Sequence, residues 1–217
     1  MNLLETKMKY EILKDEFIEF DGRKLYRIRA LKDFHNVKKG KVGGYIASER
    51  NLSHEGEAWV YGNACVSGDA RISDDAWVYG NARVSGNVRV SDDARVYGDA
   101  RVSGNACVSG DARISDDAWV YGNACVYGNA QVAGNAQVLN RHSVVWFSNV
   151  GTENGTLTVY CGKNGLIATR GCLTGSVEEF LDKSAKVHDE KTKREYELLI
   201  EVARSRLGEA QGNIEDE

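Results

Sequence analysis

The fold of this chain is decided by the stretch VYGNACVSGDARISDDAWVYGNARVSGNVRV at residues 60–90. Every sixth residue in it is valine or isoleucine, and this spacing continues without exception as far as Val144. Four positions after each of these residues comes a small one, which from residue 64 to residue 136 is alanine everywhere except at Val88. A six-residue repeat therefore dominates the chain over residues 57–145.

The repeat length implies a coil of short strands. Because side chains alternate along a strand, the aliphatic residue and its alanine can face the same side. The pairs between them, such as Gly62-Asn63 and Asp74-Asp75, suit turns that β-branched residues cannot adopt. Each hexad is then a strand plus a corner, and three hexads close a triangular coil. The fifteen hexads predict a mainly β prism of five coils with valine inside.

The hexad pattern resembles the hexapeptide-repeat left-handed β-helix superfamily. That pattern is an aliphatic residue, a glycine or polar residue, two variable positions, a small residue and one further, unspecified position. Residues 84–89, VSGNVR, fit it. The left-handed sense of the helix is implied by the resemblance alone, since spacing does not determine handedness.

An N-terminal β cap is expected over residues 1–56. Two short strands, 17–20 and 24–31, flank Asp21-Gly22, a pair favoured in tight hairpin turns. Ile46 and Leu52 are also six residues apart, which predicts an irregular first coil leading into the repeat. Such a cap would cover the open β edge that every solenoid has at its end.

A C-terminal α+β cap is expected over residues 146–208, after the repeat fails at His142. Strands are predicted at 143–148, 156–161 and 166–171. Ser176 and Glu179 form a capping box that opens a helix as far as residue 187, and a second helix is predicted at 190–207. The acidic residues 209–217 are expected to be a disordered tail.

The segments outside the coils resemble a group of hexapeptide-repeat proteins of bacteria and their phages. The resembling segments are LYRIRALKDF at 25–34, GGYI at 43–46, the run 52–64, WFSNVG at 146–151 and RGCLTG at 170–175. The resemblance implies a phage or prophage accessory protein, with blocking of a host defence protein as one role. It transfers no catalytic residue.

Composition excludes several classes of protein. A formal net charge of −4 does not suggest a nucleic-acid binder, and no stretch is long and apolar enough to span a bilayer. The N-terminus lacks the apolar region of a signal peptide, so we expect a cytoplasmic protein. The five cysteines are odd in number and lack C-x-x-C spacing, which favours free thiols. Cys107 and Cys125 should lie one strand apart on one face.

Enzymatic activity is not expected from the sequence. Acyltransferases of the superfamily use a catalytic histidine beside a loop that interrupts the coils. The four histidines are His35, His54, His142 and His188, and none of them lies in the regular coils. The coils also carry no insertion. Neither a metal nor a cofactor is predicted. The alternatives are an acetyl-CoA-dependent acyltransferase-like enzyme, with His142 the first residue to test, and a small-ligand or nucleotide binder at a subunit groove.

Large aromatic residues gather on the outer surface of the coils, and they predict a binding protein. Five fall on the face of Val60 and two on the next face: Trp59, Tyr61, Trp77, Tyr79 and Tyr97, then Trp119 and Tyr121. An exposed patch of this kind is typical of an interface. It could be a homotrimer contact, with a dimer as the alternative, a surface for a host protein, or simple cross-strand stacking.

Arginines also recur on the outer surface of the middle coils, at positions 71, 83, 89, 95, 101 and 113. Aspartates alternate with them, at positions 69, 75, 93, 99, 111 and 117. We expect a ladder of exposed ion pairs, each of small energetic value. Phosphate or nucleic-acid binding is the less favoured interpretation.

Overall fold

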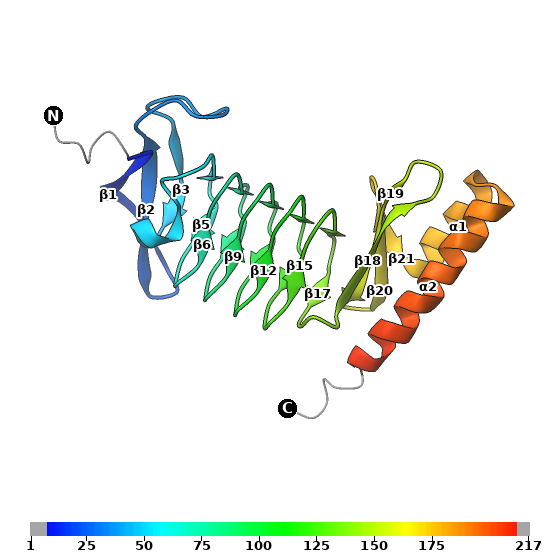
Figure 1. The fold of residues 1–217 in the computed structure, drawn as a ribbon. Helices are drawn as coiled ribbons and strands as arrows, with labels where there is room; N and C mark the ends of the chain where they lie inside the picture. Colours follow the sequence, from blue (N-terminus) through cyan, green and yellow to red (C-terminus); the bar gives the residue numbers. More distant parts are fainter. Residues whose placement is uncertain (1–7, 212–217) are drawn as a thin grey trace.

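Each hexad forms one two-residue strand, and strands from successive coils pair in parallel, 18 residues apart (Figure 1). The computed structural model describes residues 8–211. The strands of the coils are β4 (Trp59–Val60), β5 (Cys65–Val66), β6 (Arg71–Ile72), β7 (Trp77–Val78), β8 (Arg83–Val84), β9 (Arg89–Val90), β10 (Arg95–Val96), β11 (Arg101–Val102), β12 (Cys107–Val108), β13 (Arg113–Ile114), β14 (Trp119–Val120), β15 (Cys125–Val126), β16 (Gln131–Val132) and β17 (Gln137–Val138).

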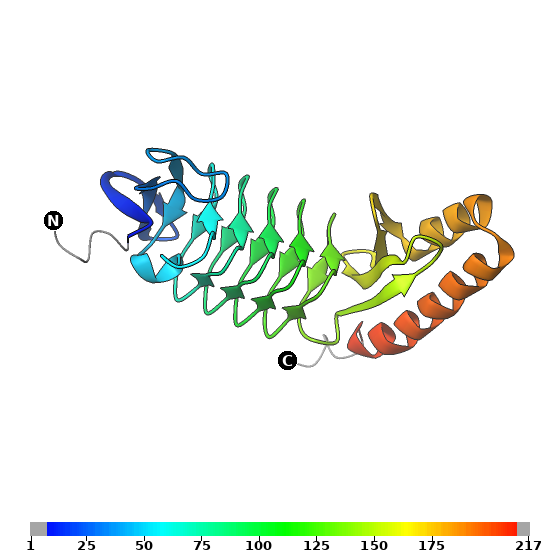
Figure 2. The ribbon, with the colours of Figure 1, turned by 45° about the horizontal axis from the view of Figure 1, so that its top comes forward.

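The strands form the three sheets of a prism, which Figure 2 shows as rows along its length. The first face contains β4, β7, β10, β13 and β16. The second contains β5, β8, β11, β14 and β17, and the third contains β6, β9, β12 and β15. The predicted solenoid of about five coils is confirmed.

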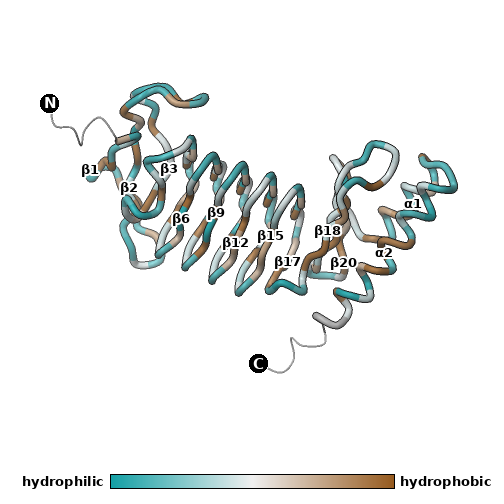
Figure 3. The backbone as a smooth tube through the Cα atoms, viewed as in Figure 1, coloured by the Kyte–Doolittle hydropathy of each residue, from teal (hydrophilic) through white to brown (hydrophobic). Residues whose placement is uncertain are grey.

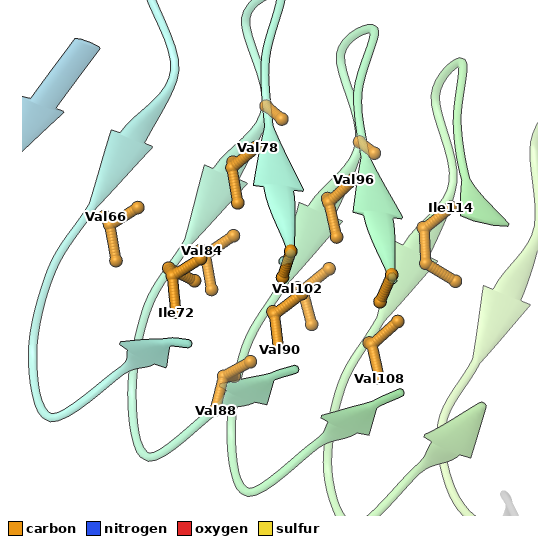
Figure 4. Packing of buried hydrophobic residues seen from close by; sticks show 14 of the residues in the cluster. Val66, Ile72, Val78, Val84, Val88, Val90, Val96, Val102, Val108 and Ile114 are labelled. Carbon is orange, nitrogen blue, oxygen red and sulfur yellow. The ribbon is translucent and has the colours of Figure 1, made fainter. Parts of the chain in front are cut away.

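The aliphatic residues of the repeat fill the inside of the prism, where Figure 4 shows the side chains from Val66 to Ile114 directed inward. Val96 is 0% and Val102 1% exposed, so the predicted register is confirmed. The alanines are equally buried where the corner narrows. Hydrophilic and hydrophobic residues alternate around each coil, as Figure 3 shows.

Three corners carry aspartate where most others have glycine. Asp74, Asp92 and Asp116 adopt left-handed backbone conformations, with φ of 57°, 57° and 56°. Their carboxylates reach the next coil: that of Asp92 accepts the N–H of Gly110 at 2.9 Å, and that of Asp116 accepts the N–H of Gly134 at 3.0 Å. These aspartates therefore tie neighbouring coils together at the corners.

The predicted ladder of arginine–aspartate ion pairs is wrong: within residues 8–211 no coil arginine lies within 4.0 Å of a carboxylate. The arginines stand on the flat faces just before the buried valines or isoleucines, whereas the aspartates of the predicted ladder stand in the turns at the corners. Aromatic rings take the place of the carboxylates: Arg83 lies over Phe20 (4.7 Å), Arg95 over Trp77 (5.6 Å) and Arg101 over Trp119 (4.9 Å).

The N-terminal cap is an antiparallel hairpin of β1 (Tyr10–Phe20) and β2 (Arg23–Ala30), joined at the predicted Asp21-Gly22 turn. Next to β2 lies β3 (Val42–Ile46), which pairs in parallel with β5. A short 3₁₀ helix, η1 (Glu49–Asn51), follows. Ile46 and Leu52 pair with Val66 and Ile72, so the predicted irregular first coil is confirmed.

Side chains of this cap satisfy the carbonyl groups at the open end of the prism. The buried Lys9 Nζ donates to the carbonyl oxygens of Ala58 at 2.8 Å and Gly56 at 3.3 Å. Burial lowers the pKa of Lys9 to about 8. The hydroxyl of Tyr10 donates to the Leu52 carbonyl at 2.8 Å. The first coil is thus closed to edge pairing.

The C-terminal cap contains a four-stranded antiparallel sheet, one strand more than predicted. It consists of β18 (Val144–Val150), β19 (Gly155–Gly162), β20 (Gly165–Arg170) and β21 (Leu173–Ser176). The fourth strand is only four residues long and follows Cys172 without an apolar run to mark it.

This sheet closes the last coil. The hydroxyl of Tyr160, a buried residue on β19, accepts the N–H of Ala133 at 3.0 Å and lies 2.6 Å from Thr169 Oγ1. Thr158 Oγ1 accepts the N–H of Gln131 at 2.9 Å. Both ends of the prism are therefore covered by side chains that satisfy backbone groups of the coils.

Two helices complete the C-terminal cap: α1 (Val177–Val187) and α2 (Glu190–Gln211). The predicted capping box is confirmed, since Ser176 Oγ accepts the N–H of Glu179 and Glu179 Oε2 accepts the N–H of Ser176. Buried residues of α1 and α2, including Phe180, pack on the sheet in a second core.

The helix α2 ends at Gln211, within the segment 209–217 that is expected to be a disordered tail. The remaining residues, 212–217, lie outside the described part of the chain.

All five cysteines are free. Cys107 and Cys125 are register partners on the third face, as the repeat predicts. Burial raises the pKa of Cys107, with the neighbouring Cys125 adding to the effect, so the thiol form is favoured.

Candidate functional site

Four half-buried rings stand in a column on the first face, and we call them the aromatic face: Tyr61, Trp77, Tyr79 and Tyr97. Tyr61 and Trp77 approach with ring centroids 5.4 Å apart. Tyr79 and Tyr97 stack at 4.8 Å with their planes 1° apart. Cross-strand stacking of this kind holds the rings in place, and each ring remains partly accessible to solvent.

Trp59 does not belong to this surface. It is 0% exposed, because the N-terminal cap folds over it. Phe34 packs edge-on against its ring at 5.3 Å and Tyr10 at 6.1 Å. We therefore remove Trp59 from the interface predicted from the sequence, since it serves as core between the cap and the first coil.

A cleft of about 570 Å³ opens beside the aromatic face. Its residues are Asn36, Lys41, Tyr61, Trp77, Tyr79 and Arg95. The loop between β2 and β3 supplies Asn36 and Lys41, so the N-terminal cap forms one wall. A floor of rings with two cations at its rim suits a flat apolar or aromatic group that carries negative charge.

A histidine–carboxylate pair lies next to this cleft, and sequence reasoning missed it. His35 Nδ1 is 2.9 Å from Glu57 Oε2, and the His35 ring packs edge-on against Trp77 at 4.9 Å. Both side chains are accessible to solvent, with exposed fractions of 42% for His35 and 45% for Glu57. A carboxylate that holds an imidazole is the arrangement of a general base. No sequence signal relates His35, in the cap, to the second coil.

Trp119 and Tyr121 form a separate site on the second face. Trp119 is 44% exposed, with the Arg101 guanidinium 4.9 Å from its ring centroid. Tyr121 is half-buried. A shallow cleft of about 260 Å³ lies beside Trp119 and includes Lys163 of the C-terminal cap. The seven predicted residues thus fall into three groups rather than the two that were predicted.

The other histidines do not approach the cleft. His54 accepts the backbone N–H of Lys9 at its Nδ1 and stacks on Tyr10 at 4.3 Å, and burial lowers its pKa. His142, where the repeat fails, is exposed in the turn before β18. His188 follows α1.

Neither a metal cluster nor a membrane span is found in the described residues. Within residues 8–211 no group of three histidine, cysteine, aspartate or glutamate side chains is arranged to hold a metal ion. No helix in that range is both long and apolar enough to cross a bilayer.

Comparison with known proteins agrees with the geometry of the coils. The family model described as YdcK Beta solenoid repeat matches residues 76–92, 82–98 and 94–110. Residues 76–110, in the middle coils, are thus similar to the repeat that this model describes. This confirms the resemblance to hexapeptide-repeat proteins.

One curated relative of this chain is "Uncharacterized acetyltransferase YdcK" of Escherichia coli (strain K12). It is 39% identical over 64 residues, which cover 24% of this chain and 20% of the relative. The chain thus spans about a fifth of the relative's length. The matched stretch is therefore a small part of both proteins.

Proposed function

We propose that this protein acts by binding another protein surface through the aromatic face, and that a second copy of the chain is the first such partner. The column of Tyr61, Trp77, Tyr79 and Tyr97 carries the proposal, because ordered rings with open sides are typical of interface centres. In this proposal the solenoid is a non-catalytic scaffold that holds the rings in register.

Side-by-side assembly is the arrangement that fits these features. The two caps cover both ends of the prism, which disfavours end-to-end stacking of copies. Flat faces packed around a symmetry axis give closed assemblies, whereas an open arrangement would give filaments. We therefore propose a parallel homotrimer, with a dimer as the alternative.

We expect the assembly to depend on Trp77 and Tyr79. Full burial of a large apolar side chain contributes about 1.5–3 kcal/mol, so replacing both rings by charges should prevent association. Light scattering should give the mass of an oligomer for the native protein at tens of micromolar, and of a monomer for the Trp77→Glu, Tyr79→Lys variant. Trp119→Glu, on the second face, is the control and should remain oligomeric.

A native protein that is monomeric would contradict self-association. The aromatic face would then be the proposed surface for a different protein. A cytoplasmic accessory protein of a phage or prophage, including an inhibitor of a host defence protein, would act through such a surface. Capture from host lysate should in that case be lost in the Trp77→Glu, Tyr79→Lys variant and kept in Trp119→Glu.

The second candidate is an acyltransferase-like activity, which the contact between His35 and Glu57 favours. The printed name of the curated relative, an acetyltransferase, points the same way. An imidazole held by a carboxylate could remove the proton of an acceptor hydroxyl or amine as the acyl group arrives. The cations Lys41 and Arg95 line the adjacent cleft.

We expect no acetyl-CoA binding at micromolar concentration, because the coils carry no loop that would enclose an acyl donor. Titration calorimetry with acetyl-CoA measures this directly. Tight binding, together with thiol release that is lost in His35→Ala and kept in His142→Ala, would support the enzyme instead.

A further inference from the structure

A cavity of about 320 Å³ lies in the C-terminal cap, away from the aromatic face. It is bounded by the turn between β20 and β21 and by the facing sides of α1 and α2. Its apolar wall includes Phe180 and Tyr196, whose rings meet edge-on at 5.1 Å. Cavities of this size and lining are typical of sites for small molecules.

Two buried polar atoms without a hydrogen-bond partner belong to residues that line this cavity: Arg170 Nε and Ser184 Oγ. Ser184 is only 4% exposed. Only two other buried side-chain nitrogen or oxygen atoms of the described residues lack a hydrogen-bond partner, and they belong to residues at the opposite end of the protein. A buried polar group without a partner costs about 1–3 kcal/mol, so two beside one cavity point to a ligand that supplies acceptors.

The charges around the cavity favour an anion. Arg170 and Lys183 both line it, and within residues 8–211 neither lies within 4.0 Å of a carboxylate oxygen. The Arg170 guanidinium donates a hydrogen bond to the carbonyl oxygen of Val150, at 3.3 Å. Glu153 is also at the cavity but makes no ion pair there. A carboxylate would satisfy both cations and the orphaned donors.

We propose that this cavity binds a small organic acid. The carboxylate accepts hydrogen bonds from Arg170, Lys183 and the Ser184 hydroxyl, while the apolar part of the ligand packs against Phe180 and Tyr196. The site is independent of the aromatic face, so the C-terminal cap would serve a purpose besides closing the prism.

Titration calorimetry of the full chain with phenylacetate, benzoate and hexanoate tests the proposal. At least one acid should bind at millimolar concentration or below. The matched neutral amide should bind at least about tenfold more weakly than the acid, because it loses the charge-assisted hydrogen bonds. If none of the three acids binds, or if acid and amide bind equally, the proposal is overturned.

Ser184→Ala separates a ligand contact from a structural role. Alanine is a good helix former and removes an unsatisfied hydroxyl, so the variant should fold at least as well as the native protein. It should nevertheless bind the acid about tenfold more weakly. Ser205→Ala, at an exposed position of α2, is the control and should bind like the native protein. Unchanged affinity in Ser184→Ala would overturn the proposed contact.

Cys172 gives a second readout, since it lines the cavity and is the one exposed cysteine of the described residues. A bound acid should slow its alkylation by N-ethylmaleimide. The half-buried Cys107, on the coils, reports any general effect of the acid. Slowing at Cys172 alone supports the site, and alkylation of Cys172 at the same rate with saturating acid contradicts it.

Discussion

Replacing Val96 with aspartate is expected to abolish the folded state. Val96 is 0% exposed, and its neighbours in register along the first face are Val78 and Ile114, which are also fully buried. The buried repeat residues that pack around it are valines, isoleucines and alanines, which offer a carboxylate no partner. Burying a charged or unpaired polar group costs several kcal/mol, and the loss of valine packing adds to this.

The measurement is urea unfolding followed by circular dichroism. Val96→Asp should give an insoluble protein or one without a cooperative transition. Arg113→Asp is the matched control, because it puts the same side chain at an exposed position on the adjacent strand β13. A soluble Val96→Asp protein with the native midpoint would show that the proposed register is wrong.

The sequence predicts the coils well because their structure is local. The hexad determines which residue faces inward and which pair turns the corner, so the burial of Val96 follows from spacing alone. The same holds for Ser176 and Glu179, whose capping box needs only a separation of three residues.

The candidate site could be predicted only in part, because it depends on how the N-terminal cap docks. Periodicity places Trp77 and Tyr79 on one face, but nothing in the pattern shows that Phe34 covers Trp59. Nor does it bring His35 to Glu57. These contacts join a segment without a repeat to the coils, and no rule of spacing relates the two.

The prediction of a ladder of arginine–aspartate ion pairs was wrong for a different reason. Alternation along the sequence suggested pairing, yet neighbouring positions in a hexad differ in direction. Arg95 lies on a flat face, whereas Asp93 and Asp99, its neighbours in the predicted ladder, lie in the turns at the corners. Proximity in sequence is therefore a poor guide to ion pairs in a coil this narrow.

The corner at Gly104 is expected to be sensitive to the addition of a single methyl group. Its φ is +73°, and a Cβ there would lie 2.8 Å from both the backbone N and O of Gly122 in the next coil. A left-handed conformation costs a residue other than glycine about 1–2 kcal/mol, and overpacking typically costs about 1–3 kcal/mol more. Gly104→Ala should therefore lower the free energy of unfolding by about 2–5 kcal/mol.

Gly62→Ala separates the two costs, because Gly62 has a similar φ of +61° but its Cβ would meet nothing nearer than 3.6 Å. Only the conformational cost of about 1–2 kcal/mol should remain there. Urea midpoints of the two variants and the native protein give the comparison. Equal losses would mean that the contact between coils does not limit the corner, and that the glycines are required for their backbone conformation alone.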